Sequence, residues 1–174
     1  MSKIMNNIIP VNRDMMKYSS IKIKVEFFTD EELFQIFNWI HEHVQSAKRK
    51  KEIDYYRKYY LLIKFLLRTG ARIDEVLAIR PADINLEMNV ITLITLKKKD
   101  KEAKRTIPLH PELKSDIMQY YLDYNINKRS EDKLFKVTRQ SADTFFKKIQ
   151  KDLNFKIHAH KFRHTFAVKA VLSG

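Results

Sequence analysis

Three short stretches of this sequence carry side chains that could bind a phosphate group and transform it. They are residues 69–75 (Thr-Gly-Ala-Arg-Ile-Asp-Glu), residues 97–105, which are rich in lysine, and residues 158–164 (His-Ala-His-Lys-Phe-Arg-His). Arginine grips two phosphate oxygens with its planar fork, lysine can protonate a leaving oxygen, and histidine exchanges protons near neutral pH. The combination predicts phosphate chemistry if the fold brings the three stretches together.

The first stretch places Arg72 directly after a glycine turn, at the expected start of a helix. Free backbone N–H groups and the helix dipole favour an anion at such a position. Glu75 lies one helical turn further on, and we expect it to orient Arg72. A plain surface ion pair between Arg72 and Glu75 is the alternative that the sequence leaves open.

The second stretch has the pattern of a charged turn between two strands. Residues 90–96 are β-branched and apolar, residues 97–104 are charged, and residues 105–109 form a second short strand, so a β-hairpin is expected. A lysine-tipped turn can enter a DNA groove and bring an ammonium group to a leaving oxygen. A merely solvated turn is the alternative. The candidate DNA-binding residues are Lys97, Lys98, Lys99, Lys101, Lys104 and Arg105.

The third stretch predicts a helix that begins near His160. His160 and Arg163 then share one face, while Phe162 and Phe166 anchor the opposite face in the core. His160 could assist proton transfer while Arg163 holds the phosphate oxygens. His160 and His164 have the spacing of metal ligands, but no acidic residue lies inside the motif, so no metal site is predicted. Histidines that only cap or pack remain the alternative.

Composition limits the possible classes of protein. The 174 residues carry 34 Lys and Arg against 21 Asp and Glu, a net charge of +13, which is compatible with a nucleic-acid partner. The sequence has no cysteine, which excludes disulfide scaffolds, thiol nucleophiles and Cys-ligated metal centres. No apolar run is long enough for a membrane helix. We therefore expect a soluble cytoplasmic protein without a membrane partner.

The elements that must position these stretches are mostly helical. A capping box at residues 29–32 opens the first helix, and Pro111 suits the first turn of a later one. The expected fold class is mainly α with a small antiparallel β-hairpin or sheet (α+β). Residues 1–24 are expected to be an arm or linker, and residues 25–174 one domain. Further helices are expected over residues 54–69, 72–79, 111–125, 141–153 and 160–172.

The motifs together are more specific than each alone. Thr-Gly-Ala-Arg-Ile-Asp-Glu-Val-Leu, a hairpin that closes on Lys-Arg-Thr-Ile-Pro-Leu, and His-Lys-Phe-Arg-His-Thr-Phe-Ala occur in this order. This order resembles the catalytic domain of the tyrosine recombinases, the phage-integrase and Xer-type family, from Phe27 to Leu172. The resemblance implies a mostly helical catalytic domain that cuts and rejoins double-stranded DNA through a phosphotyrosine intermediate, without metal or other cofactor.

The resemblance also implies a role for each matching residue. Arg72 and Arg163 would clamp the scissile phosphate, and His160 would assist proton transfer at the attacking nucleophile. Lys97 would protonate the leaving 5′ oxygen, with Lys98 and Lys99 as alternates because the lysine run blurs the register. Glu75 and His164 would support these groups.

The sequence departs from the family near its end. The family supplies a second His or Trp and then the nucleophilic tyrosine after this helix, whereas residue 174 is the last here. We expect an incomplete catalytic domain that is inactive in cleavage, with no nucleophile in this chain, because Tyr120, Tyr121 and Tyr124 match no family motif for the nucleophile.

The sequence leaves alternatives for the oligomeric state and for the functional class. The family's recombinases act as homotetramers on DNA, and we expect this chain to be a monomer with an exposed apolar groove. A non-catalytic DNA-binding module derived from a recombinase, or a type IB topoisomerase-like domain, is the alternative.

Overall fold

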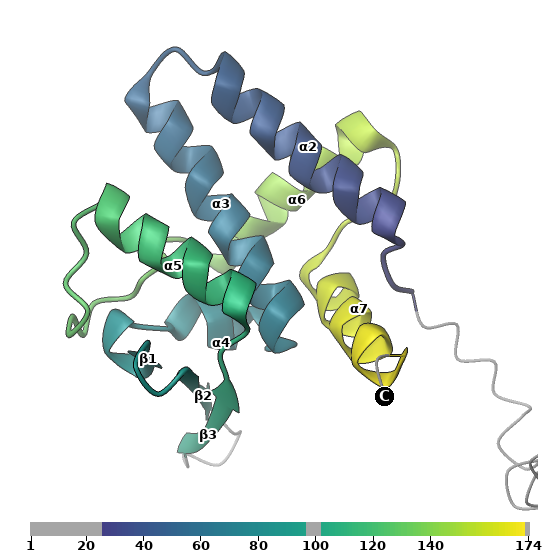
Figure 1. Cartoon of the computed structure of the whole chain (residues 1–174). Helices are drawn as coiled ribbons and strands as arrows, with labels where there is room; N and C mark the ends of the chain where they lie inside the picture. The colour runs from purple at the N-terminus through teal and green to yellow at the C-terminus, as the bar shows by residue number, and fades with distance from the viewer. Residues whose placement is uncertain (1–25, 97–101, 173–174) are drawn as a thin grey trace, which may run out of the picture.

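In a computed structural model of the chain, the structure describes residues 26–96 and 102–172 (Figure 1). The labels follow Figure 1. Helices are α2 (Asp30–Ser46), α3 (Lys50–Thr69), α4 (Ile73–Ala78), the single 3₁₀ turn η1 (Pro81–Asp83), α5 (Pro111–Asp123), α6 (Arg139–Leu153) and α7 (Ala159–Leu172). Strands are β1 (Ile84–Asn85), β2 (Val90–Leu96) and β3 (Glu102–Pro108). The fold class expected from the sequence, mainly α with a small antiparallel sheet, is confirmed.

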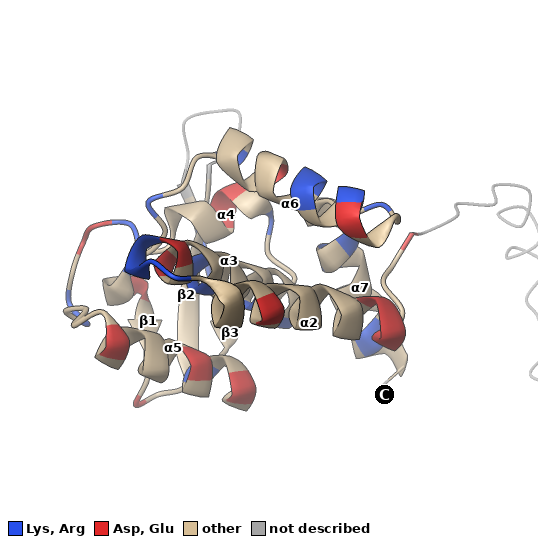
Figure 2. Cartoon of the chain, turned by 90° about the horizontal axis from the view of Figure 1, so that it is seen from above, with Lys and Arg blue, Asp and Glu red and all other residues tan. Residues whose placement is uncertain are grey.

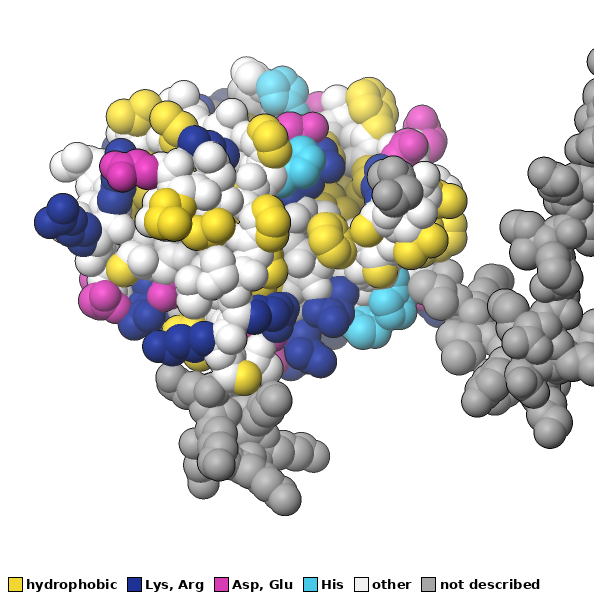
Figure 3. All heavy atoms as spheres, turned by 60° about the horizontal axis from the view of Figure 1, so that its bottom comes forward, with side chains coloured by type: hydrophobic (Ala, Val, Ile, Leu, Met, Phe, Trp, Pro, Cys, Tyr) yellow, Lys and Arg dark blue, Asp and Glu magenta, His cyan; other side chains and the backbone are white. Residues whose placement is uncertain are grey.

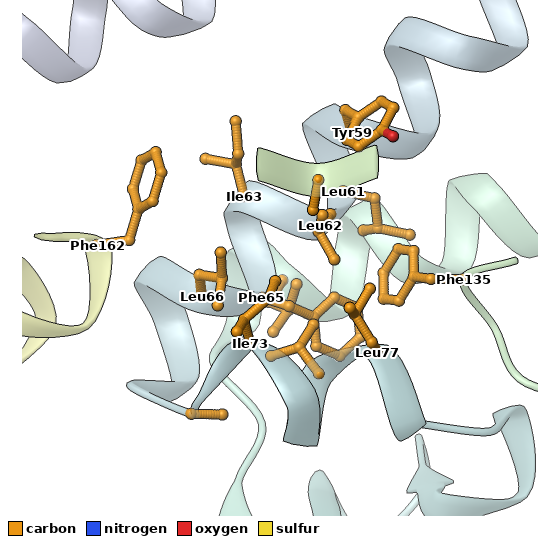
Figure 4. Close-up of a cluster of buried hydrophobic side chains, with 14 of the residues drawn as sticks. Tyr59, Leu61, Leu62, Ile63, Phe65, Leu66, Ile73, Leu77, Phe135 and Phe162 are labelled. Carbon is orange, nitrogen blue, oxygen red and sulfur yellow. The ribbon is translucent and has the colours of Figure 1, made fainter. Parts of the chain in front are cut away.

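Helix α3 is the centre of the fold, and α2, α4, α5 and α7 pack against it. Its apolar side chains are too many for one stripe, so several faces are buried at once. Figure 4 shows Phe162 of α7 on one side of this cluster and Phe135, from the loop before α6, on another. Leu62, Phe65 and Leu66 are fully buried. A helix covered on several sides gives the residues at its C-terminal end fixed positions.

The sheet is larger than the expected hairpin. Strand β1 pairs antiparallel with β2, which pairs antiparallel with β3, so the order is β1-β2-β3. The second hairpin strand was expected to begin at Arg105, but β3 begins at Glu102, and Lys104 therefore lies in the strand, opposite Ile94. The charges of this stretch suggested a turn. They fit a strand because Lys104 and Thr106 face solvent, while Ala103, Arg105 and Ile107 are half-buried.

Helix α7 is fastened to the start of α2 by polar contacts. The ammonium group of Lys161 lies 3.2 Å from a carboxylate oxygen of Glu32 and 4.2 Å from the ring centre of Phe28. The hydroxyl of Thr165 accepts a hydrogen bond from the backbone N–H of Phe28 at 2.8 Å. These contacts fix the first half of α7.

The expected burial pattern of α7 is correct for Phe162 and wrong for Phe166. Phe162 is fully buried, whereas Phe166 is 36% exposed and Val171 is 80% exposed. The buried positions of this helix are Lys161, Phe162 and Thr165. The later turns run past the body of the fold, and no element in the described part of the chain covers them (Figure 1).

Among the described residues, no helix is both long enough and apolar enough to cross a membrane.

Candidate phosphate-binding site

A glycine turn at the end of α3 carries Arg72 to the start of α4. Gly70 caps α3 with φ +59°, a left-handed conformation that favours glycine, and its N–H donates to the carbonyl of Leu66. The hydroxyl of Thr69 accepts a hydrogen bond from the backbone N–H of Ala71 at 3.1 Å. Arg72 follows as the residue that caps α4, and its side chain is 60% exposed. The sequence expectation of a glycine turn before a helix is confirmed.

Helix α7 brings the second arginine to the same turn. A guanidinium N–H of Arg163 donates to the backbone carbonyl of Gly70 at 2.5 Å. The ring of Phe166 lies against Gly70 so closely that a Cβ atom there would be 2.3 Å from the ring. The Phe166 contact needs a residue without a side chain at position 70. The glycine therefore serves two purposes, a left-handed turn and a close approach of α7 to α3.

Arg72, His160 and Arg163 line one small pocket of about 160 Å³. Its other lining residues are Ala71, Ile73, Asp74, Arg139 and Ala159. The three predicted residues come from two segments about 90 positions apart in the sequence, and the fold brings them together. Figure 3 shows the underside of the molecule, where Lys and Arg side chains gather beside His side chains.

Glu75 is buried beside this pocket and holds several groups at once. It is 3% exposed, accepts the backbone N–H of Arg72 at 2.8 Å, and lies 3.6 Å from the Arg72 guanidinium. Both terminal nitrogens of Arg105 donate to it, at 2.7 and 2.8 Å, and the hydroxyl of Thr95 donates to it as well. The carboxylate thus joins the start of α4 to strands β2 and β3.

The charge of Glu75 is stabilised by these partners. Burial alone would raise its pKa, but the hydrogen bonds from Arg105, Thr95 and the Arg72 N–H outweigh burial and lower the pKa to about 2. Arg105 was predicted to bind DNA, and here its guanidinium is shared between Glu75 and Thr95. No short motif indicates this pairing, because Glu75 and Arg105 lie 30 positions apart in the sequence.

His160 lines the pocket, and its surroundings favour the neutral imidazole. Burial lowers its pKa, and the neighbouring His164, His158, Arg163 and Arg72 lower it further. The His164 ring packs edge-on to the His160 ring, with centres 4.1 Å apart. A neutral imidazole beside two guanidinium groups can accept a proton while they hold an anion.

Arg139 lines the pocket as well, although it was not among the site residues predicted from the sequence. It opens α6, and its guanidinium pairs with Asp74 of α4 at 2.8 Å, with both side chains more than 60% exposed. Its signal was weak, since it precedes the predicted start of that helix by two residues. A third arginine therefore lines the pocket, paired with an aspartate that lines it as well.

The hairpin lysines are described only in part. Lys97, Lys98, Lys99 and Lys101 lie outside the described residues. Lys104 is exposed on β3. Glu75 nevertheless anchors both strands of this hairpin beside Arg72, through Thr95 and Arg105.

The described tyrosines lie on α3 and α5, and none of them lines the pocket. Burial raises the pKa of Tyr120 to about 12 and also raises the pKa of Tyr121 and Tyr124. Tyr124 donates its hydroxyl proton to Asp54 at 2.8 Å. No group of three or more His, Asp or Glu side chains in the described part of the chain is arranged to hold a metal ion.

Comparison with known proteins identifies relatives of this chain. The family model described as "Phage integrase family" matches residues 26–174. A probable integrase/recombinase of Aquifex aeolicus is 27% identical over 180 residues, which cover 89% of this chain and 56% of that protein. The tyrosine recombinase XerA of Saccharolobus solfataricus is 29% identical over 135 residues, 78% of this chain and 42% of that one. The chain thus spans about half the length of these relatives.

Solved structures share the fold. The XerH site-specific recombinase bound to its difH substrate has a TM-score of 0.58 and 21% identity, covering 85% of this chain and 43% of that chain. The Tn1549 transposon integrase in complex with a circular intermediate DNA has a TM-score of 0.60 and 19% identity, covering 88% of this chain and 55% of that chain.

Proposed function

This chain belongs to the phage integrase family, and we propose that it binds double-stranded DNA and holds one backbone phosphate for strand cleavage and rejoining. The observation that carries the proposal is the shared pocket of Arg72, His160 and Arg163. Two guanidinium groups and a neutral imidazole in one small pocket match the charge of a phosphodiester and the proton transfer that its substitution requires.

The proposed reaction is a transfer of the phosphoryl group from DNA to a tyrosine. The tyrosine oxygen forms a bond to phosphorus, the bond from phosphorus to the 5′ oxygen breaks, and the reverse step rejoins the strand. His160 assists removal of the tyrosine proton, and a hairpin lysine, Lys97 with Lys98 and Lys99 as alternates, gives a proton to the 5′ oxygen. Arg72 and Arg163 stabilise the charge on the two non-bridging phosphate oxygens while the bond to the other DNA oxygen stays intact, so the proposed step uses no metal.

Glu75 and His164 act as positioning residues in this proposal. Glu75 fixes the backbone of Arg72 and the two hairpin strands relative to each other. His164 packs against the His160 ring and its Nδ1 lies 3.3 Å from the backbone carbonyl of Glu26. Neither side chain lines the pocket.

The proposal assigns the nucleophile to a tyrosine outside these 174 residues, because none of the described tyrosines lines the pocket and those of α5 have raised pKa values. In a longer protein we propose a tetramer on two DNA sites, and for this chain a monomer, acting in the cytoplasm. A DNA-binding module that keeps the pocket without the chemistry is the second candidate, favoured by the same observation that none of the described tyrosines lines the pocket.

A binding assay tests the pocket first. Arg72→Ala and Arg163→Ala should each weaken binding to a fluorescent duplex by about tenfold or more at low salt, because each removes charge-assisted hydrogen bonds to phosphate. Arg57→Ala is the matched control, since Arg57 is paired with Asp123 at 2.9 Å on another face and its removal should change affinity less than about twofold. Unchanged affinity in both pocket variants would contradict the proposal.

A cleavage assay separates the two candidates. A suicide substrate, whose broken strand diffuses away, is incubated with this chain and with a version extended through the downstream reading frame. A covalent protein–DNA adduct with the extended version alone supports a strand-transferring enzyme whose nucleophile lies beyond residue 174. Binding without an adduct in either protein supports the DNA-binding module.

A further inference from the structure

A second cavity, separate from the phosphate pocket, lies between the start of α3, the end of α5 and the loop that leads to α6. Its volume is about 610 Å³, within the range of roughly 300 to 1,000 Å³ that is typical of small-molecule sites. It shares no lining residue with the phosphate pocket. The function proposed above gives this cavity no role.

Backbone hydrogen bonds hold one wall of the cavity in place. The N–H of Ala82 donates to the carbonyl of Ser130 at 3.1 Å, and the N–H of Leu134 donates to the carbonyl of Ile79 at 2.8 Å. These two bonds tie the loop before α6 to the segment around η1. The cavity is therefore built into the fold, as is usual for small-molecule sites.

Aromatic and apolar side chains make up one part of the lining. The half-buried rings of Tyr120 and Tyr124 lie with their centres 4.5 Å apart. The Tyr124 hydroxyl donates to Asp54 at 2.8 Å, which holds this ring between α5 and α3. The other apolar lining residues are Pro81, Ile126 and Leu134. Such a surface can take up the flat ring of a ligand, because aromatic rings pack favourably against each other.

Lysines make up the other part of the lining: Lys51, Lys58, Lys133 and Lys136. In the described structure no ion pair or hydrogen bond engages the ammonium groups of Lys51, Lys133 or Lys136, and all three residues are exposed. Figure 2 shows Lys and Arg along the connection from α2 to α3 and along the loop between α5 and α6. These ammonium groups are thus available to an anion that enters the cavity.

Two aspartates line the cavity as well and balance only part of this charge. Asp54 already accepts the Tyr124 hydroxyl, and Asp132 is exposed. The four lysines outnumber the two aspartates, so the lining favours a ligand with more than one negative charge. A DNA duplex keeps its bases stacked inside the helix, so it offers no free ring to the tyrosines.

We propose that this cavity binds a small nucleotide-like anion, that is, a planar aromatic ring that carries two or more negative charges. Tyr120 and Tyr124 contact the ring, and the lysines contact the anionic group. The site is distinct from the one that holds the DNA phosphate, since Lys58 lies about 18 Å along α3 from Gly70. The inference therefore does not depend on the proposed function.

A binding experiment with three probes tests the chemistry of the ligand. ATP offers a ring and charge, adenosine only the ring, and tripolyphosphate only the charge. Calorimetry at low salt, without divalent cations, should show that ATP binds at least about tenfold more tightly than either of the others, because only ATP uses both parts of the lining. Tripolyphosphate that binds as tightly as ATP would overturn the inference.

A further probe distinguishes two sources of the same chemistry. Trimesate is a benzene ring that carries carboxylates in place of phosphates. Binding of ATP without trimesate supports a nucleotide as the ligand, and binding of trimesate without ATP supports an aromatic carboxylate. Binding of both supports the shared chemistry. Binding of neither would overturn the inference.

Variants of Tyr124 test the ring contact. Tyr124→Leu removes the ring and should weaken ATP binding by about tenfold or more, since stacking on an aromatic side chain contributes substantially to the binding of a base. Tyr124→Phe is the matched control, because it keeps the ring and loses only the hydrogen bond to Asp54. It should change ATP affinity by less than about twofold. Equal losses in the two variants would contradict the ring contact.

Variants of equal net charge test the lysines. Lys133→Gln with Lys136→Gln should weaken ATP binding by about tenfold or more, because both ammonium groups line the cavity. The control is Lys156→Gln with Lys169→Gln, two lysines that pair with acids elsewhere, and it should have an effect of less than about twofold. Equal effects would mean that net charge alone matters, and would overturn the inference.

Photo-labelling tests the location directly. Azido-ATP should label the peptide that contains Tyr120 and Tyr124. Label on the peptide that contains Arg163, together with loss of ATP binding in Arg163→Ala, would place the nucleotide in the phosphate pocket and overturn the inference. Neither result affects the DNA-binding test of the proposed function, so the two proposals can fail separately.

Discussion

Helix α3 carries cations on two faces, and their surroundings differ. On the face toward α5, Arg57 pairs with Asp123 at 2.9 Å and Lys64 lies 3.7 Å from both Glu112 and Asp116. Arg68 pairs with Glu112 as well. On the face that shares a cavity with Lys133 and Lys136, Lys51 and Lys58 have no carboxylate partner among the described residues.

This difference shows that residue type alone does not determine whether a cation pairs with an acid of the fold or stays available to bind an anion. Lysines occur on both faces of the same helix. Where α5 supplies acids, the positive charge is balanced and joins two helices. Where the neighbouring loop supplies more lysines, the charge stays available for an anion. The phosphate pocket shows both patterns: Arg163 contacts a backbone carbonyl and no carboxylate among the described residues, whereas Arg72 lies 3.6 Å from Glu75 and Arg105 pairs with the same carboxylate.

The largest expected effect comes from removing Glu75, the buried acid that pairs with Arg105. Glu75→Gln should lower the free energy of unfolding by about 3 kcal/mol at pH 7, because it leaves a buried ion-pair network without its anion. Thermal and chemical unfolding measure the loss. Glu112→Gln is the control, since Glu112 is 53% exposed. Equal losses in the two variants would contradict a special role for the buried carboxylate.

The same residue gives a pH dependence with a defined sign. The pKa of Glu75 is about 2 in the folded protein and about 4.5 when unfolded. Its contribution to stability is therefore complete above about pH 4.5 and is lost as the pH falls toward 2. The Glu75→Gln variant should lose this part of the acid sensitivity, and unfolding midpoints measured from pH 6 down to pH 3 would reveal it.

A substitution of Gly70 alters no charge, so it tests whether the position of Arg163 matters as much as its charge. Gly70→Ala should cost about 1 to 3 kcal/mol of stability, because φ is +59° and the new Cβ would meet the Phe166 ring at 2.3 Å. It should also weaken DNA binding, because displacement of α7 moves Arg163 away from the Gly70 carbonyl. Calorimetry and the fluorescence binding assay measure the two effects.

A double variant separates the two costs of Gly70→Ala. Phe166→Ala in the same chain removes the steric clash but leaves the left-handed backbone strained, so the two substitutions should be less than additive in stability. Strict additivity would mean that the ring contact does not contribute.

The smallest expected effect comes from removing an exposed acid on the α5 face of α3. Glu112→Gln leaves Lys64 and Arg68 on the α5 face with less balancing charge. It should cost less than about 1 kcal/mol, since exposed ion pairs contribute little. DNA affinity should change less than about twofold. A rise in affinity comparable to the loss expected for Arg72→Ala would show that net charge, and not its place on the surface, determines binding.

Much of the fold follows from local signals in the sequence. The capping box at Thr29 and Glu32 forms as expected, and so do the glycine cap after Thr69 and the helix that begins at Pro111. These features depend on residues within a few positions of one another, so spacing reveals them. The three-stranded sheet was only partly predicted, because the two residues of β1 form a strand only through their pairing with β2.

Some features of the candidate site likewise follow from local sequence, and others depend on the tertiary structure. The sequence by itself determined the types and local spacing of Arg72, His160 and Arg163, since a glycine turn and a helix start are local features. Only the tertiary structure decided that they line one pocket, that Arg139 joins them, and that Arg105 pairs with Glu75. It also decided which lysines of α3 lie beside acids of α5 and which do not. The physical reason is that ion pairing depends on distance in space, and residues far apart in the sequence become neighbours only after folding.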